Sequence, residues 1–164
     1  MSSSPGWLQE KLILPEELGK WAANLRLQNK TIATLNGSFD LLHAGHLFII
    51  HEASKQADVL IVALNSDSSI QKYKGEKRPI IGLQDRLEMM AAIQFVDYVT
   101  YFDEVDPREL LKKIKPDVHV NGAEYGANCI EAEILKSLGA KLHLCPRMDG
   151  LATSAIIQKI QACV

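Results

Sequence analysis

The sequence has few of the features that mark a secreted, membrane-bound or nucleic-acid-binding protein. Only three of its 164 residues are cysteines, and they show no C-x-x-C pair, so we expect a reduced, cytoplasmic setting rather than a disulfide framework. The formal net charge is only −2, which gives no basic surface for nucleic acid. No apolar run reaches the length of a membrane span, and the first residues lack the layout of a signal peptide. We therefore expect neither a nucleic-acid partner nor a membrane partner.

What the sequence does contain is the composition of an ordinary globular domain. Hydrophobic residues make up 47% of the chain and charged residues 23%, and a chain of this length can bury one core. Residues 1–13 begin with Ser, Pro and Gly and predict a flexible N-terminal arm. Residues 14–164 predict a single domain.

Apolar runs alternate with helical patterns through that domain. The run at 59–64 is apolar without interruption, which is typical of a strand covered on both faces. Residues 72–82, which contain Lys, Gly and Pro, predict a loop. The alternation predicts an α/β fold, a Rossmann-like three-layer α/β/α arrangement with a mainly five-stranded parallel sheet. Expected strands lie at 31–35, 59–64, 98–102, 118–120 and 141–145, and expected helices at 15–25, 47–55, 83–93, 107–115, 128–138 and 153–160.

The most informative stretch is N-G-S-F-D-L-L-H-A-G-H at 36–46, between an expected strand and an expected helix. Small residues in such a turn let the backbone approach an anion. The first turn of the helix offers unpaired N–H groups and the positive end of a dipole. His43 and His46 are three residues apart, so they project from one face of a helical turn. Because ligands of parallel sheets bind beyond the carboxyl ends of the strands, the stretch predicts a site for the phosphates of a nucleoside triphosphate.

The two histidines have an alternative interpretation as metal ligands or ordinary surface side chains. A pair spaced i, i+3 can hold zinc, and His51 is the nearest third candidate. Five positions beyond His46, however, His51 does not share the face of the pair. Phosphate binding is therefore the favoured interpretation.

Several short motifs resemble one known superfamily. H-A-G-H at 43–46 matches the H-x-G-H signature of the nucleotidyltransferases, and G-S-F-D-L-L-H at 37–43 resembles their cytidylyltransferase-like branch. Further segments look like the heptose 1-phosphate adenylyltransferase domain of bacterial ADP-heptose synthesis, and the resemblance covers roughly residues 14–162. These segments lie at 62–67, 74–79, 85–86 and 96–99.

The resemblance implies transfer of a nucleotide from ATP to a sugar 1-phosphate, above all D-glycero-D-manno-heptose 1-phosphate, with release of pyrophosphate. The attacking phosphate is already an anion, so catalysis should come from positioning and charge neutralisation rather than from a general base. Mg²⁺ should accompany the nucleotide, held by phosphates and water, without a protein metal site. Related enzymes are homodimers with contacts near residues 96–97, so a homodimer is expected.

Two alternative functions stay open. One is a cytidylyltransferase for glycerol phosphate or a similar alcohol phosphate, because backbone groups that any residue supplies often select the base. The other is a nucleotide-binding protein without turnover. It is suggested by departures from the family pattern at Asn121, Ala152 and Ala155, where the family usually has a lysine and a Ser-Thr-Thr-Arg segment.

The resemblance also assigns expected roles to single residues. His43 and His46 would contact the α- and β-phosphates, and Lys74 would bridge nucleotide and acceptor phosphates as a mobile point charge. Three of the acceptor-binding candidates also have an alternative interpretation. Asp40 could instead hold the turn, Arg86 could form an internal ion pair, and Arg108 could simply be exposed to solvent. The expected nucleotide-binding residues are Gly37, Ser38, Phe39, Gly45, Gly122, Ala123, Tyr125, Arg147, Thr153 and Ser154, and the expected acceptor-binding residues are Asp40, Asn65, Arg86 and Arg108.

Overall fold

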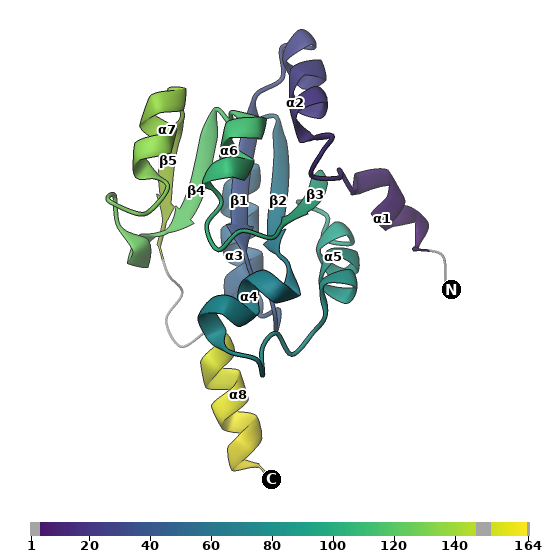
Figure 1. Cartoon of the computed structure of the whole chain (residues 1–164), viewed down its shortest axis with the longest axis vertical. Helices are drawn as coiled ribbons and strands as arrows, with labels where there is room; N and C mark the ends of the chain where they lie inside the picture. The colour runs from purple at the N-terminus through teal and green to yellow at the C-terminus, as the bar shows by residue number, and fades with distance from the viewer. Residues whose placement is uncertain (1–3, 147–151, 164) are drawn as a thin grey trace.

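Five strands form one sheet in which every neighbouring pair runs parallel, in the order β3-β2-β1-β4-β5. The structure, a computed structural model, describes residues 4–146 and 152–163. Helices lie on both faces of the sheet (Figure 1), which confirms the Rossmann-like α/β/α prediction. The strands are β1 (Ile32–Gly37), β2 (Val59–Asn65), β3 (Tyr98–Phe102), β4 (Val118–Gly122) and β5 (Lys141–Cys145).

The two faces of the sheet are buried by different helices. On one face, Leu35 and Val62 pack into a core with side chains of the helices that follow β1 and precede β3. On the other face, Ile32 and Ile61 pack with the helices that precede β1 and follow β3. Alternate residues of one strand therefore supply both cores, which is why β2 is buried at all seven positions. The helices are α1 (Gly6–Lys11), α2 (Leu18–Leu27), α3 (Ala44–Ser54), α4 (Asp67–Lys74), α5 (Leu83–Ala91), α6 (Arg108–Ile114), the 3₁₀ turn η1 (Ala123–Tyr125), α7 (Ala132–Leu138) and α8 (Thr153–Ala162).

The N-terminal segment differs from its prediction. Residues from Gly6 onward form α1, and Leu8 is only 1% exposed within the core that also contains α5. Lys11 Nζ donates a hydrogen bond of 2.6 Å to the carbonyl of Val96, and Leu12 forms a bridge with Val99 of β3. The flexible arm predicted for residues 1–13 is therefore wrong over 6–13. Leu8, Leu12 and Ile13 pack against the two cores, and the Ser/Pro/Gly composition of the first six residues does not indicate this burial.

Helix α4 is an element that the sequence analysis did not predict. Ser66 caps its start, because the Ser66 hydroxyl accepts a hydrogen bond from the Ser69 N–H at 3.2 Å. Gly75 ends it with a φ of +88°, a conformation that favours glycine. Lys74 is therefore the last residue of a helix, and the predicted loop over 72–82 begins only at Gly75.

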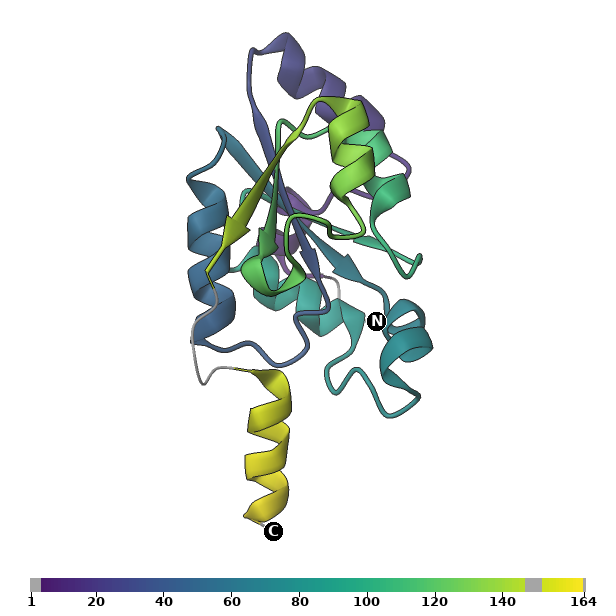
Figure 2. The same cartoon turned by 90° about the vertical axis from the view of Figure 1, so that its left-hand side faces the viewer.

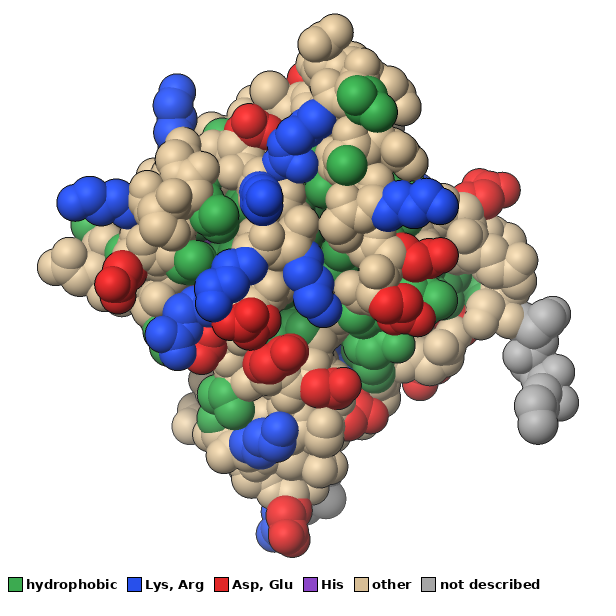
Figure 3. All heavy atoms as spheres, turned by 45° about the horizontal axis from the view of Figure 1, so that its top comes forward, with side chains coloured by type: hydrophobic (Ala, Val, Ile, Leu, Met, Phe, Trp, Pro, Cys, Tyr) green, Lys and Arg blue, Asp and Glu red, His purple; other side chains and the backbone are tan. Residues whose placement is uncertain are grey.

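Helix α8 extends away from the rest of the molecule and touches it at its first turn (Figures 1 and 2). None of its residues is buried. None of the helices in the described ranges has the length and apolarity needed to cross a bilayer. On the face drawn in Figure 3, lysine and arginine side chains lie among acidic ones.

Candidate active site

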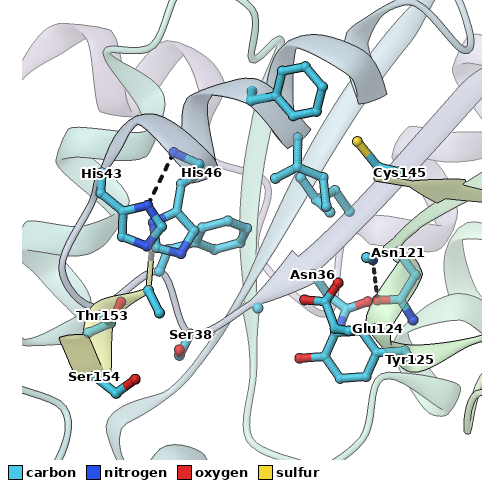
Figure 4. Close-up of a pocket in the computed structure, with 18 of the residues that line it drawn as sticks. Asn36, Ser38, His43, His46, Asn121, Glu124, Tyr125, Cys145, Thr153 and Ser154 are labelled. Atoms are coloured by element: carbon cyan, nitrogen blue, oxygen red, sulfur yellow. Dashed lines mark hydrogen bonds between the residues drawn. The ribbon is translucent and has the colours of Figure 1, made fainter. Parts of the chain in front are cut away.

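A cavity of about 610 Å³ opens at the carboxyl ends of β1 and β4. The strand order reverses between these two strands, so the cavity lies at the position where sheets of this type bind ligands. The start of α3 and the start of α8 also border it (Figure 4). Its lining includes Asn36, Gly37, Ser38, Phe39, His43, Gly45, His46, Lys74, Arg78, Asn121, Gly122, Glu124, Tyr125, Cys145, Thr153 and Ser154.

His43 has a structural role at the start of α3 in addition to lining the cavity. It is the N-cap, and its Nδ1 accepts a hydrogen bond from the Gly45 N–H at 3.2 Å. An accepting Nδ1 carries no proton, so the proton of the neutral ring is on Nε2. Burial lowers the pKa of His43, which keeps the ring neutral at pH 7. His43 therefore offers one N–H donor whose tautomer is fixed by the helix.

His46 stacks on His43 with ring centroids 3.9 Å apart and an interplanar angle of 25°. Burial, followed by the nearby charges of His43 and Lys74, lowers the pKa of His46 to about 4. Its Nδ1 is buried and has no hydrogen-bond partner among the residues that the structure describes. The structure thus brings the two histidines together as neutral groups on one wall of the cavity (Figure 4).

The turn after β1 approaches the histidines closely. Phe39 is buried, has a φ of +45° and meets the His46 ring edge-on at 5.4 Å. A Cβ at Gly37 would lie 3.1 Å from the Phe39 ring, so a side chain at 37 would press on this ring. Ser38 and Gly45 complete the part of the predicted phosphate loop that lines the cavity.

Lys74 reaches the cavity from the end of α4. Its Nζ donates a hydrogen bond of 2.9 Å to the Ser38 hydroxyl. Burial and the neighbouring charge of Arg78 lower the pKa of Lys74, although the charge of Asp40 opposes that effect. The ammonium group of Lys74 is thus held at the end of β1 beside a second cation.

The wall opposite the histidines is formed by the end of β4 and by η1 (Figure 4). Asn121 Oδ1 accepts from the Gly122 N–H at 3.1 Å, and Asn121 Nδ2 donates to Glu131 at 3.4 Å. A Cβ at Gly122 would meet the carboxylate of Glu124, so a larger residue at 122 would displace that side chain. Tyr125 lines the cavity. Ala123, between the lining residues Gly122 and Glu124, is exposed and is not itself part of the lining.

The first turn of α8 brings Thr153 and Ser154 to the cavity. The N-cap of α8 is Ala152, which offers no side-chain cap. Thr153 Oγ1 donates to the carbonyl of Leu41 at 3.4 Å, which ties α8 to the turn before α3. The uncapped N–H groups of this turn are available to an anion. Arg147 lies outside the described residues.

Four predicted acceptor-binding residues lie outside the cavity lining. Asp40 is 1% exposed, and its carboxylate accepts hydrogen bonds from Arg78 and from the N–H groups of Ile80 and Ile81. It therefore holds the loop after α4 to the turn after β1, as its alternative interpretation proposed. Asn65 is buried and donates to the Ser69 hydroxyl at 3.0 Å.

The two predicted arginines are also engaged elsewhere. Arg86 has a fully buried side chain that donates to Asp67 at 2.7 Å and to the carbonyl of Ser38 at 2.6 Å. Arg108 pairs with Asp106 at 2.8 Å in a separate surface hollow. Arg86 thus forms the internal ion pair of its alternative interpretation, and Arg108 forms a surface ion pair outside the cavity lining.

The cavity contains residues that the sequence analysis did not select. Arg78, Asn36, Glu124 and Cys145 line it. The Arg78–Pro79 pair was part of the family resemblance, and this was the one signal that could have identified Arg78. Across the described ranges, no group of three His, Cys, Asp or Glu side chains is placed to hold a metal ion.

A parallel sheet with a cavity at its switch point, bordered by helix N-termini, is typical of nucleotide-binding α/β proteins. A family model described as Cytidylyltransferase-like matches residues 34–156. The chain belongs to this family.

Curated relatives carry the name "Bifunctional protein HldE". The protein from Wolinella succinogenes is 39% identical over 161 residues, which cover 98% of this chain and 33% of the relative. The protein from Aliarcobacter butzleri is 42% identical over 146 residues, which cover 89% of this chain and 30% of the relative. The chain thus spans about a third of the length of these relatives.

Two solved structures are similar in fold. One is a lipopolysaccharide core biosynthesis protein from Thermoplasma volcanium, with a TM-score of 0.59, 27% identity, and coverage of 73% of this chain and 97% of that chain. The other is a pantoate-beta-alanine ligase from Francisella tularensis complexed with beta-gamma ATP and beta-alanine, with a TM-score of 0.63 and 16% identity. It covers 92% of this chain and 79% of that chain, and at this identity the likeness concerns the fold alone.

Proposed function

We propose that this chain transfers the adenylyl group of ATP to a sugar 1-phosphate, with D-glycero-D-manno-heptose 1-phosphate as the acceptor. The motifs that resemble an adenylyltransferase of ADP-heptose synthesis support this proposal. Relatives named HldE that are 39% and 40% identical to nearly the whole chain add further support.

The observation that carries the proposal is the convergence of three kinds of anion-binding group on one cavity. His43 and His46 provide neutral imidazoles, Lys74 provides a cation, and the start of α8 provides N–H groups beside Thr153. A triphosphate needs several such groups along its length, because its charge is distributed over three phosphorus centres.

The proposed reaction needs no proton transfer. An oxygen of the acceptor phosphate forms a bond to the α-phosphorus of ATP, and the bond from that phosphorus to the α,β-bridging oxygen breaks. Pyrophosphate leaves with the electron pair of that bond. Nε2–H of His43 donates to a phosphate oxygen, and Lys74 neutralises charge between the two substrates. Catalysis then comes from orientation and from donors fixed before the reaction.

Mg²⁺, a homodimer and a cytoplasmic location belong to the same proposal. The absence of a three-ligand cluster from the described ranges fits a Mg²⁺ ion that is held mostly by phosphate oxygens and water. Such an ion, when bound, supplies neutralisation of phosphate charge. Use of ATP and three free cysteines are compatible with the cytoplasm.

The proposal is tested with purified protein, Mg²⁺ and four substrate pairs. ATP or CTP is combined with heptose 1-phosphate or glycerol 3-phosphate, and both pyrophosphate release and the product mass are measured. We expect ADP-heptose from the first pair. A CDP-linked product would favour the cytidylyltransferase alternative, and tight ATP binding without pyrophosphate from any pair would favour a binding protein without turnover.

A further inference from the structure

We propose that Arg78 and Lys74 together bind the phosphate of the acceptor, on the β2 side of the cavity. This inference rests on the proposed function and adds to it a residue that has no assigned role. Arg78 takes the acceptor-binding role that the sequence suggested for Arg86 and Arg108, which are engaged in ion pairs outside the cavity.

Arg78 is held firmly and still faces the cavity. Its Nε donates to Asp40 Oδ2 at 2.7 Å, and its side chain is 18% exposed. Asp40 also accepts from the N–H groups of Ile80 and Ile81 at 2.8 Å and 2.9 Å. A guanidinium group carries five N–H donors in a planar fork. One edge can therefore be anchored by Asp40 while other donors remain for a ligand.

The charge balance around Arg78 favours an anion. Lys74 lies close enough that the charge of Arg78 lowers its pKa, in addition to the effect of burial. The nearby carboxylate, Asp40, is shared between Arg78 and two backbone N–H groups. Two cations kept together in a partly buried place repel each other unless an anion lies between them. A phosphate group supplies that anion and matches the fork of an arginine.

The topology separates the two substrates. Ligands in this class of sheet occupy the switch point, here between β1 and β4, where Gly122 and Tyr125 line the cavity. This leaves the nucleoside on the β4 side and the triphosphate along the starts of α3 and α8. Helix α4 follows β2, on the other side of β1. Lys74 and Arg78 therefore reach the cavity from the β2 side, which the nucleotide does not occupy and where the acceptor can bind.

The test measures phosphate binding to nucleotide-loaded protein. The protein is saturated with Mg²⁺ and α,β-methylene-ATP and titrated with inorganic phosphate, followed by NMR. Arg78→Gln is compared with Lys77→Gln, which removes one positive charge from an exposed neighbour in the same loop that is not part of the cavity lining. We expect Arg78→Gln to weaken phosphate binding at least about tenfold. We expect Lys77→Gln to change phosphate binding less than about twofold, and neither variant to change the Kd of the nucleotide more than about twofold.

Other outcomes overturn the inference. Equal losses in both variants would indicate a general charge effect. A loss confined to nucleotide binding would assign Arg78 to the triphosphate, and unchanged binding of both ligands would remove Arg78 from the site. If Arg78→Gln does not fold, Arg78→Lys keeps a cation beside Asp40, and a loss of about threefold or more in phosphate binding alone is then expected from the missing fork.

A kinetic measurement separates this inference from the proposed function. With ATP and heptose 1-phosphate, Arg78→Gln should raise the KM of the acceptor while leaving the KM of ATP within about twofold. If the wild-type protein forms no product from this pair, the proposed function fails. The phosphate titration still decides whether Arg78 binds phosphate.

Discussion

At the scale of single residues, one histidine links the stability of a helix to the chemistry of the cavity. The Nδ1 of His43 caps α3, and that hydrogen bond places the proton on Nε2. The same imidazole therefore satisfies a backbone N–H and presents a donor of defined tautomer to a ligand. An H-x-G-H sequence places the capped N–H on the glycine two positions later, where no side chain interferes with an approaching anion.

This double role predicts different results for two substitutions of His43. The oxygen of Asn can accept the Gly45 N–H in place of Nδ1 but does not extend to the position of Nε2. His43→Asn should keep the thermal unfolding midpoint within about 2 °C of wild type and lower kcat by about 10²–10³. His43→Ala should lower kcat similarly and also destabilise the protein by about 1 kcal/mol. Equal stability of the two variants would contradict the capping role.

The residues of the site differ in how far the sequence could reveal them. His43, His46, Gly37 and Ser38 were predictable because a strand, a turn and a helix start define their relative positions locally. The arginines were not, because an arginine is a ligand-binding group or an ion-pair partner according to its tertiary neighbours. Arg86 faces Asp67, whereas Arg78 faces the cavity, and neither relation is visible in the spacing along the chain.

At the scale of elements, α4 determines which lysine reaches the site. Residues 67–74 have mixed polar character, so their helical state depends on the Ser66 cap and on the burial of Ile70 rather than on a strong apolar periodicity. Once the helix forms, Lys72 and Lys74 point in different directions, since neighbours two apart do not share a face. Lys74 Nζ donates a hydrogen bond to the Ser38 hydroxyl, whereas Lys72 Nζ donates one to the carbonyl of Asp103 at 3.3 Å.

The two lysines of α4 therefore form a matched pair. Lys74→Ala should lower kcat/KM for ATP and for the acceptor by about tenfold or more, because a cation beside both phosphates is lost. Lys72→Ala removes the same charge from the same helix and should change either value less than about twofold. Steady-state kinetics with each substrate varied in turn measure both values of kcat/KM. If Lys74→Ala changed them as little as Lys72→Ala, Lys74 would be an ordinary solvent-exposed lysine.

Arg86 links three segments near the cavity through hydrogen bonds of its buried side chain. Its guanidinium reaches Asp67 of α4, the carbonyl of Ser38 after β1 and the carbonyl of Ile81 before α5. Arg86→Met should therefore destabilise the fold by about 2–4 kcal/mol, because three partners lose a buried donor. Chemical unfolding measures the loss. At a temperature where the variant stays folded, the KM of the acceptor should stay within about threefold, whereas a substrate contact would raise it much more.

At the scale of the whole molecule, the sheet order brings distant segments to one place. The layers were predictable from the alternation of apolar runs and helices, because each parallel connection needs a crossing helix. The order β3-β2-β1-β4-β5 was not, since β4 (V-H-V-N-G) and β5 (K-L-H-L-C) both mix polar with apolar residues, although β4 is internal and β5 lies at the edge. That order puts β1 beside β4, so Ser38 after β1, Gly122 of β4 and the start of α8 all line one cavity.

The central position of β1 and β4 also predicts how the fold responds to acid. His119 of β4 is fully buried beside its register partner Thr34 of β1, and its Nδ1 lies 2.8 Å from the Thr34 hydroxyl. Its Nε2 is buried and has no hydrogen-bond partner in the described part of the chain. Burial lowers the pKa of His119 to about 4 from an ordinary value of 6.5. In the unfolded chain the imidazole gains a proton below pH 6.5, whereas in the folded protein it stays neutral down to about pH 4.

Stability should therefore fall as the pH decreases from 6.5 towards 4, because the unfolded state binds the proton more readily. For these two pKa values, His119 alone contributes a loss of about 2 kcal/mol between pH 7.5 and 5. His119→Gln keeps a partner for Thr34 but cannot be protonated. It should lower the free energy of unfolding at pH 7.5 and reduce the acid loss by about 2 kcal/mol, as measured by urea unfolding at both pH values. If the variant lost as much stability between pH 7.5 and 5 as the wild type, protonation of His119 would not oppose folding. The buried contact between β1 and β4 would then tolerate a charged imidazole.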